Sequence, residues 1–243
     1  MDITIASAPE LAVTAADLIT ELLAKKPDAV LGLATGSSPL LTYDELVRRY
    51  QAGEVSFAQA RAFTLDEYVG LPAGHPERYC HVIEREFTNR VDLAVENVHG
   101  PDGLAEDLEH AGQALETAIK AAGGVDLQLL GIGSNGHIAF NEPGSPFDSR
   151  TRMLPLTEQT RRDNSRFFDG DLTQVPTHCI TQGLGTIMEA KHLVLVATGE
   201  GKAEAVRELV YGDPSPQWPA TVLQSHPNVM VLLDPAAASL LRP

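Results

Sequence analysis

A histidine, a carboxylate and two amides follow a short apolar stretch in the middle of the chain. Residues 127–132 read LQLLGI, and the length of this run and its glycines predict a buried strand. Asn135, His137, Asn141 and Glu142 come directly after it. Histidine titrates near neutral pH, and a neighbouring carboxylate or amide can fix its tautomer. The spacing therefore predicts a proton-transfer site; a structural loop whose polar groups cap one another is the alternative.

A second candidate is a turn of small residues between a predicted strand at 28–35 and a predicted helix at 40–50. The turn, GSSP at 36–39, would present free backbone N–H groups and the positive end of a helix dipole to an anion. No Gly-Lys-Ser/Thr follows, so it is not a Walker loop. On the residues alone, it is either a phosphate-binding loop or an ordinary strand-to-helix turn.

The middle of the chain resembles the glucosamine-6-phosphate deaminase (isomerase) family, whose signature is close to G-x-G-x-x-G-H-I-x-F-N-E-P. Residues 131–143, GIGSNGHIAFNEP, match it in full. Further family motifs match at 35–39 (T-G-x-[ST]-P), 66–71 (D-E-Y-x-G-L) and 164–168 (N-S-R-F-F). The resemblance covers nearly the whole chain and is to the short, non-allosteric bacterial members.

The resemblance implies roles for individual side chains. The implied catalytic residues are Asp66, Asn135, His137 and Glu142. The implied phosphate-binding residues are Thr35, Gly36, Ser37, Ser38, Arg166 and Lys202, the arginine as a planar fork. Without the resemblance, the acidic residue at 66 and the basic residues at 166 and 202 would be interpreted as solvated surface charges.

The reaction implied by the resemblance belongs to amino sugar catabolism. Glucosamine 6-phosphate and water give fructose 6-phosphate and ammonia. His137 would open the sugar ring, with Glu142 orienting it, and Asp66 would move a proton from C2 to C1. Isomerisation and amine loss are proton transfers, so no cofactor is expected, and no cluster of residues suggests a metal.

Strands and helices alternate along the chain and would position these loops. Helices are predicted at 9–25, 40–50, 76–87, 104–122 and 157–168, after the turn at 199–202, and as a short closing helix at 235–242. This alternation predicts one domain over residues 1–243, an α/β fold with a single doubly wound, mostly parallel sheet and helices on both faces. Such a fold is Rossmann-like.

Composition limits the partners. The net charge of −15 argues against nucleic acid, because binding it needs a basic face. No apolar run is long enough to span a membrane, and the N-terminus lacks a signal peptide pattern. Cys80 and Cys179 suggest neither a disulfide framework nor a metal site, so we expect a cytoplasmic protein. The expected partner is a sugar phosphate; monomer or homo-oligomer stays undecided.

Four of the positions that depart from the family pattern bear on the site. Asn135 stands where some members have Asp, and an amide offers a neutral hydrogen bond in place of a charge. Leu154 and Pro155 replace the Lys-Thr pair with which allosteric members bind N-acetylglucosamine 6-phosphate, so we expect no such activation. Gln182 stands where an apolar residue is usual, so the packing around it should differ.

Three other functions are compatible with these sequence features to different degrees. A galactosamine-6-phosphate deaminase would keep the same residues. A 6-phosphogluconolactonase-like hydrolase would share the fold and phosphate site but would not need the intact 137–143 loop. A non-catalytic regulator that binds sugar phosphates would usually carry a DNA-binding domain, for which the chain has no spare residues.

Overall fold

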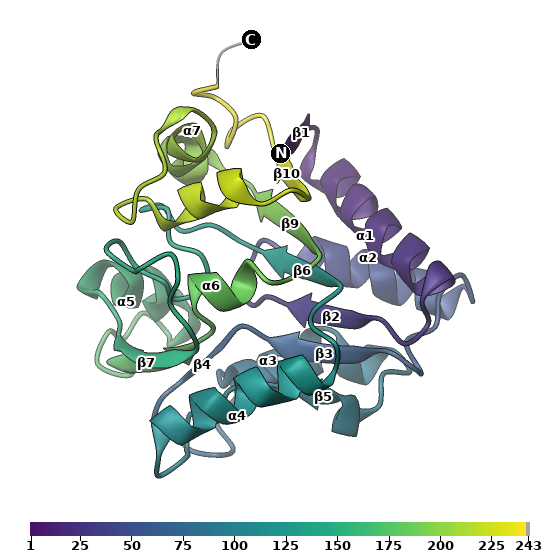
Figure 1. The fold of residues 1–243 in the computed structure, drawn as a ribbon, viewed down its shortest axis with the longest axis horizontal. Coiled ribbons are helices and arrows are strands. Elements are labelled where there is room, and N and C mark those ends of the chain that lie inside the picture. The colour runs from purple at the N-terminus through teal and green to yellow at the C-terminus, as the bar shows by residue number, and fades with distance from the viewer. Residues whose placement is uncertain (242–243) are drawn as a thin grey trace.

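A seven-stranded parallel sheet forms the centre of the computed structural model, which describes residues 1–241 (Figure 1). The strand order is β1-β10-β9-β6-β2-β3-β5, and every neighbouring pair is parallel. The strands are β1 (Asp2–Ile5), β2 (Val30–Leu33), β3 (Arg61–Thr64), β5 (Val98–His99), β6 (Leu127–Leu130), β9 (His192–Ala197) and β10 (Val229–Leu233). β2 and β6 are buried at every position, as expected for central strands covered on both faces.

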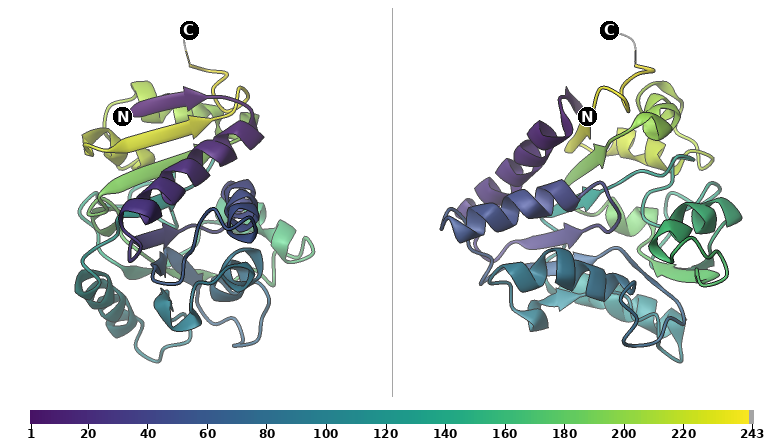
Figure 2. Two further views of the ribbon diagram at one scale, coloured as in Figure 1. Left: turned by 90° about the vertical axis from the view of Figure 1, so that its right-hand side faces the viewer. Right: turned by 180° about the vertical axis from the view of Figure 1, so that it is seen from behind.

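Helices cover both faces of this sheet (Figures 1 and 2). One face carries α1 (Ala8–Lys25), α2 (Leu40–Gln51) and α3 (Tyr79–Glu86), and the other carries α4 (Leu108–Ala121), α6 (Leu184–Ile187), α7 (Ala203–Tyr211) and the 3₁₀ helix η5 (Pro219–Ser225). The chain builds outward in one direction from β2 and in the other from β6, so right-handed crossovers place the two helix sets on opposite faces. The predicted doubly wound α/β fold is confirmed.

A second, smaller sheet lies beside the carboxyl ends of the parallel strands (Figure 1). It is antiparallel, in the order β4-β8-β7, from β4 (Asp66–Tyr68), β8 (His178–Thr181) and β7 (Arg152–Pro155). With α5 (Glu158–Asn164) it encloses an apolar cluster of its own, centred on Tyr68, Phe140 and Phe168. This sheet was not predicted from the sequence.

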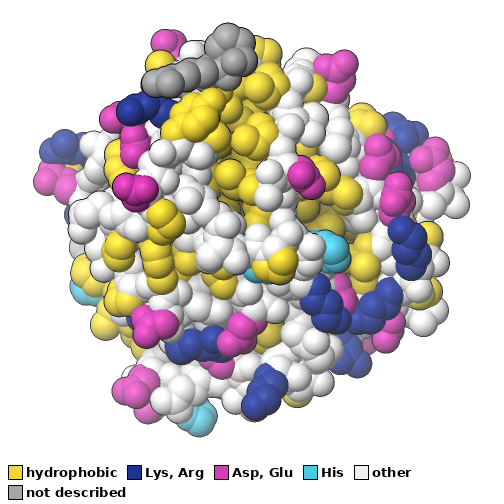
Figure 3. Space-filling view, turned by 45° about the horizontal axis from the view of Figure 1, so that its top comes forward, with side chains coloured by type: hydrophobic (Ala, Val, Ile, Leu, Met, Phe, Trp, Pro, Cys, Tyr) yellow, Lys and Arg dark blue, Asp and Glu magenta, His cyan; other side chains and the backbone are white. Residues whose placement is uncertain are grey.

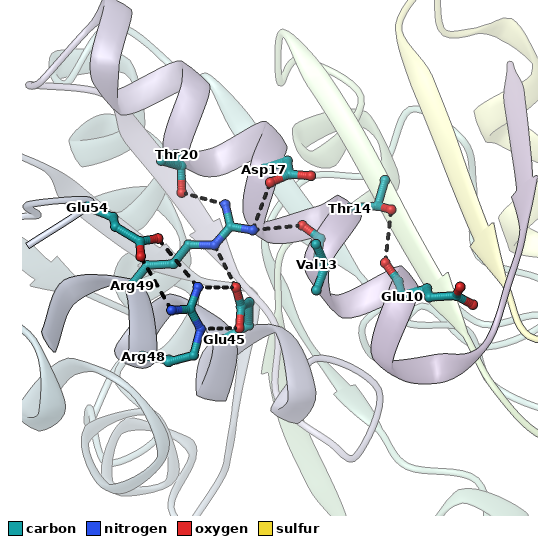
Figure 4. A network of polar contacts seen from close by, with 9 residues as sticks. All are labelled: Glu10, Val13, Thr14, Asp17, Thr20, Glu45, Arg48, Arg49 and Glu54. Atoms are coloured by element: carbon teal, nitrogen blue, oxygen red, sulfur yellow. Dashed lines mark hydrogen bonds and ion pairs between the residues drawn. The ribbon is translucent and has the colours of Figure 1, made fainter. Parts of the chain in front are cut away.

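The helix that follows the 36–39 turn is anchored at its far end (Figure 4). Arg49 of α2 is 7% exposed and donates hydrogen bonds to Asp17 (2.7 Å) and Thr20 (3.2 Å) of α1. It also bonds Glu45 of its own helix at 2.8 Å. This network fixes α2 against α1 and so holds the N-terminus of α2 in place.

Most predicted helices are confirmed, with differences at the ends of the chain. The helix expected at 235–242 is wrong, because residues 235–240 form turns, and its last residue lies outside the described range. Strands β1 and β5 were not predicted, and short 3₁₀ helices lie at Thr88–Arg90, Val95–Asn97, Ser165–Phe167 and Glu200–Lys202.

Among residues 1–241, no helix has both the length and the apolar character to cross a membrane. Figure 3 shows an apolar strip beside a group of Lys and Arg side chains.

Candidate active site

A pocket of about 410 Å³ opens at the carboxyl ends of the parallel strands. Its walls include residues that follow β2, β3, β6 and β9, namely Thr35, Asp66, Ser134 and Thr198. β2 and β6 are neighbours, and from them the sheet continues in opposite directions. Ligands of doubly wound proteins bind at such a reversal, so the pocket has the position expected of an active site.

The predicted phosphate-binding groups all line the pocket. Thr35, Gly36, Ser37 and Ser38 line it, together with Arg166 and Lys202 from distant parts of the chain. Burial, and then the charge of the arginine, lower the pKa of Lys202. An anion placed between these two cations would be attracted by both.

His137 owes its place in the pocket wall to two glycines. A Cβ on Gly133 would lie 2.3 Å from the imidazole ring, so only glycine leaves room for it. Gly136 has φ +80°, and a Cβ there would lie 2.7 Å from the Trp218 ring. These glycines therefore position the imidazole and do not merely make the loop flexible.

Glu142 stands behind the imidazole and uses both carboxylate oxygens. Oε2 accepts a hydrogen bond from Asn135 Nδ2 at 2.8 Å and lies 3.7 Å from His137 Nδ1. Oε1 accepts hydrogen bonds from Thr157 Oγ1 at 3.1 Å and from Thr160 Oγ1. The two threonines belong to the N-cap and first turn of α5, so this helix reaches the carboxylate.

The partners of Glu142 keep it ionised. Burial favours the neutral form, but the nearby His137, the Thr160 hydroxyl and the Asn135 amide outweigh burial and lower the pKa of Glu142 to about 2. His137 Nδ1 is buried without a hydrogen-bond partner. A protonated ring would therefore find its counter-charge in Glu142.

Asp66 lies in the pocket wall and, unlike Glu142, has surroundings that favour its neutral form. It is the first residue of β4 and is 5% exposed. Burial, and then the charge of Glu67, raise the pKa of Asp66 to about 8. Glu67 accepts hydrogen bonds from the backbone N–H groups of Tyr79 (2.9 Å) and Cys80 (3.2 Å), so it caps α3 and leaves Asp66 to the pocket.

Aromatic side chains near Asp66 form part of the pocket wall and were not predicted from the sequence. Tyr79 lines the pocket, stacks on Phe140 at a centroid distance of 5.7 Å and donates a hydrogen bond from its hydroxyl to Tyr68 at 3.3 Å. Asn164 Nδ2 also donates to the Tyr68 hydroxyl, at 2.8 Å. The H-P-x-x-Y run at 75–79 was the one signal for Tyr79.

The pocket brings together eight of the ten predicted site residues. Asn135 and Glu142 are not among the residues that line it; they form a layer behind His137. The contribution of Thr157 and Thr160 was not predicted, although Thr is a preferred N-cap residue and Thr157 stands at the start of a predicted helix. Within residues 1–241, no three His, Cys, Asp or Glu side chains group as a metal site would require.

Comparison with known proteins decides the family. The family model for glucosamine-6-phosphate isomerases/6-phosphogluconolactonase matches residues 4–231. The chain belongs to this family. It is 69% identical over 228 residues to the glucosamine-6-phosphate deaminase of Mycolicibacterium smegmatis, covering 94% of this chain and 87% of that protein. It is 65% identical over 240 residues to the deaminase of Beutenbergia cavernae, covering 99% and 92%.

Solved structures of the family agree with the fold. A monomeric glucosamine-6-phosphate deaminase has a TM-score of 0.96 at 41% identity, covering 99% of this chain and 100% of that chain. The 6-phosphogluconolactonase of Trypanosoma cruzi has a TM-score of 0.78 at 22% identity, covering 100% and 97%. The second likeness concerns the fold alone, whereas the first extends to the sequence. The resemblance to the deaminases seen in the sequence is confirmed.

Proposed function

We propose that this protein is a glucosamine-6-phosphate deaminase that converts glucosamine 6-phosphate and water into fructose 6-phosphate and ammonia. One observation carries the proposal: His137, which is paired with Glu142, and the buried Asp66 line a single pocket that is also lined by residues 35–38, Arg166 and Lys202. High identity to named deaminases over nearly the whole chain supports it. The reaction belongs to amino sugar degradation.

Ring opening is the task of His137. The imidazole takes the proton of the anomeric hydroxyl and returns one to the ring oxygen, as general base and then acid. Glu142, whose carboxylate lies 3.7 Å from Nδ1, stabilises the imidazolium formed between these steps. Asn135 holds that carboxylate in place through its amide.

Isomerisation is the task of Asp66. Its carboxylate removes the proton from C2 of the open-chain sugar, which gives an enolamine, and C1 then gains a proton. Water adds at C2 and ammonia leaves, so the atoms balance without a redox step. The raised pKa of about 8 makes this carboxylate a stronger base than an exposed aspartate.

The phosphate is held at the other end of the pocket. Thr35, Gly36, Ser37 and Ser38 offer backbone and hydroxyl donors, and Arg166 and Lys202 offer charge. All these groups come from the same chain, so we propose that one domain of 243 residues suffices for the site. We propose the cytoplasm as its location, where the free Cys80 and Cys179 stay reduced.

Ammonia release tests the proposal. The purified protein should release ammonia from glucosamine 6-phosphate faster than from galactosamine 6-phosphate, with Asp66→Asn as the inactive control. 6-Phosphogluconolactone should not be hydrolysed above background. Because Leu154 and Pro155 replace the Lys-Thr pair of allosteric members and cannot pair with a phosphate, N-acetylglucosamine 6-phosphate should leave the kinetics unchanged. Lactone hydrolysis without ammonia release would refute the proposal.

A further inference from the structure

Gln182 is a buried polar residue between the two catalytic loops. It is 1% exposed and follows Thr181, the last residue of β8. A buried amide costs free energy unless it is hydrogen-bonded, so its partners indicate why it is there.

The residue holds the backbone that leads into Asp66. Its side-chain Nε2 donates a hydrogen bond to the carbonyl of Thr64 at 2.9 Å, and its backbone N–H donates to the carbonyl of Leu65 at 2.8 Å. Asp66 itself pairs with Thr181 in the β4–β8 ladder. The two peptide units before the aspartate are therefore fixed by one residue.

The same residue also holds the loop of the histidine. The carbonyl of Gln182 accepts a hydrogen bond from Asn141 Nδ2 at 2.8 Å, and this amide also donates to the Ile138 carbonyl at 3.0 Å. Asn141 is fully buried and directly precedes Glu142. Gln182 thus bonds both sides of the site at once.

We infer that Gln182 is a positioning residue that sets Asp66 in register with the His137–Glu142 loop, an inference that rests on the proposed deaminase function. Its side-chain amide is the part that acts on Thr64, because the other bonds are made by its backbone. Gln182 is not among the pocket-lining residues, so it acts through others. A misplacement of about 1 Å can cost on the order of 10²-fold in rate.

Gln182→Met tests this inference, because it keeps the length of the side chain and removes the amide donor. The kcat of ammonia release should fall by about ten-fold or more. KM for glucosamine 6-phosphate and the inhibition constant of inorganic phosphate should stay within about two-fold, because the phosphate end is held by other residues. Gln182→Val serves as a second, smaller apolar variant if the methionine variant does not fold.

Gln224→Met is the matched control. Its Nε2 also caps two backbone carbonyls, those of Leu209 and Gly212 at 2.9 and 2.8 Å, at the end of α7. It should lower the melting temperature without changing kcat. Unchanged kcat in a folded Gln182 variant, or an equal loss in the Gln224 variant, would overturn the inference. An unmodified protein that releases no ammonia would overturn the proposed function as well, which separates the two failures.

Discussion

Two buried carboxylates at the site differ in acidity: Asp66 lines the pocket, and Glu142 lies behind His137. Asp66 and Glu142 are 5% and 8% exposed, yet their pKa values are about 8 and about 2. Burial opposes ionisation in both. The difference comes from their neighbours, because Asp66 has the charge of Glu67 beside it, whereas Glu142 has His137 and three hydrogen-bond donors.

This contrast suggests a division of labour between the two sides of the site. A carboxylate with a pKa near working pH can take up and give back a proton, as the base at C2 must do. A carboxylate with a pKa of about 2 stays charged and can only orient and stabilise its partner. Environment, not residue type, assigns the two roles.

Replacing Asp66 should have the largest effect. Asp66→Asn should lower kcat by about 10³-fold or more, within the range for loss of a general base. In the unmodified protein, kcat/KM should rise with pH until about 8, because the base must lose its proton. An ammonia assay from pH 5 to 9 measures both; a variant with at least a tenth of the activity would remove Asp66 from the mechanism.

The same variant should be more stable than the unmodified protein at alkaline pH. The pKa of Asp66 is higher in the folded state, about 8, than the ordinary value of 3.8, so the unfolded chain loses this proton first. The protonated Asp66 therefore contributes its full stabilisation of the fold below about pH 4, and this stabilisation is lost as pH rises to 8. Urea unfolding at pH 5 and pH 8 should show the advantage of Asp66→Asn growing by a few kcal/mol.

Replacing Glu142 should have the next largest effect and the opposite dependence of stability on pH. Glu142→Gln should lower kcat by about 10²-fold, because the imidazolium loses its counter-charge. The folded pKa of about 2 lies below the ordinary 4.5, so the carboxylate stabilises the fold above pH 4.5 and this is lost as pH falls through 2. The variant should be less stable by about 2–3 kcal/mol at pH 7, with a smaller gap at pH 3.

Replacing Thr160 tests whether the threonine hydroxyls at the start of α5 cause the low pKa of Glu142. Thr160→Val keeps the shape and removes the donor to Glu142 Oε1, so kcat should fall by roughly ten-fold and the fold should lose about 1–2 kcal/mol. Thr160→Ser should restore most of the activity. A valine variant with full activity and an unchanged pH profile would show that Asn135, His137 and Thr157 suffice.

The smallest effect is expected from a second charge beside Glu142. Asn135→Asp places a carboxylate where the amide donates at 2.8 Å, so activity should stay within about ten-fold while the pH profile of kcat moves upward. The added negative charge would stabilise the positively charged imidazole formed during ring opening. A folded but inactive variant would show that the amide hydrogen is indispensable.

Much of the site could be predicted because its residues lie in short, continuous stretches. His137 and Glu142 are five positions apart on one loop after an apolar strand, and the 36–39 turn lies between a strand and a helix. Chemistry and spacing within such a stretch are visible without coordinates. Asp66, Arg166 and Lys202 were assigned through family resemblance, because isolated charges give no such signal.

The missed contacts join residues that are far apart in the chain. Thr160 reaches Glu142 across 18 positions, and Gln182 reaches Thr64 across 118. Such pairs depend on the packing of elements and leave no local pattern. The missed strands β5 and β1 gave too little signal. β5 has two residues, and β1 alternates polar and apolar residues over only four positions and is largely exposed.

The short helix α5 offers hydroxyls to Glu142 at its start and continues into the 3₁₀ helix Ser165–Phe167, which carries Arg166. An engineer who wished to retarget this protein to an unphosphorylated amino sugar could not simply delete the arginine. A change that loosens the helix near Arg166 would also disturb Glu142 at the start of the helix. The recognition of the phosphate and the ionisation of Glu142 would therefore have to be redesigned together.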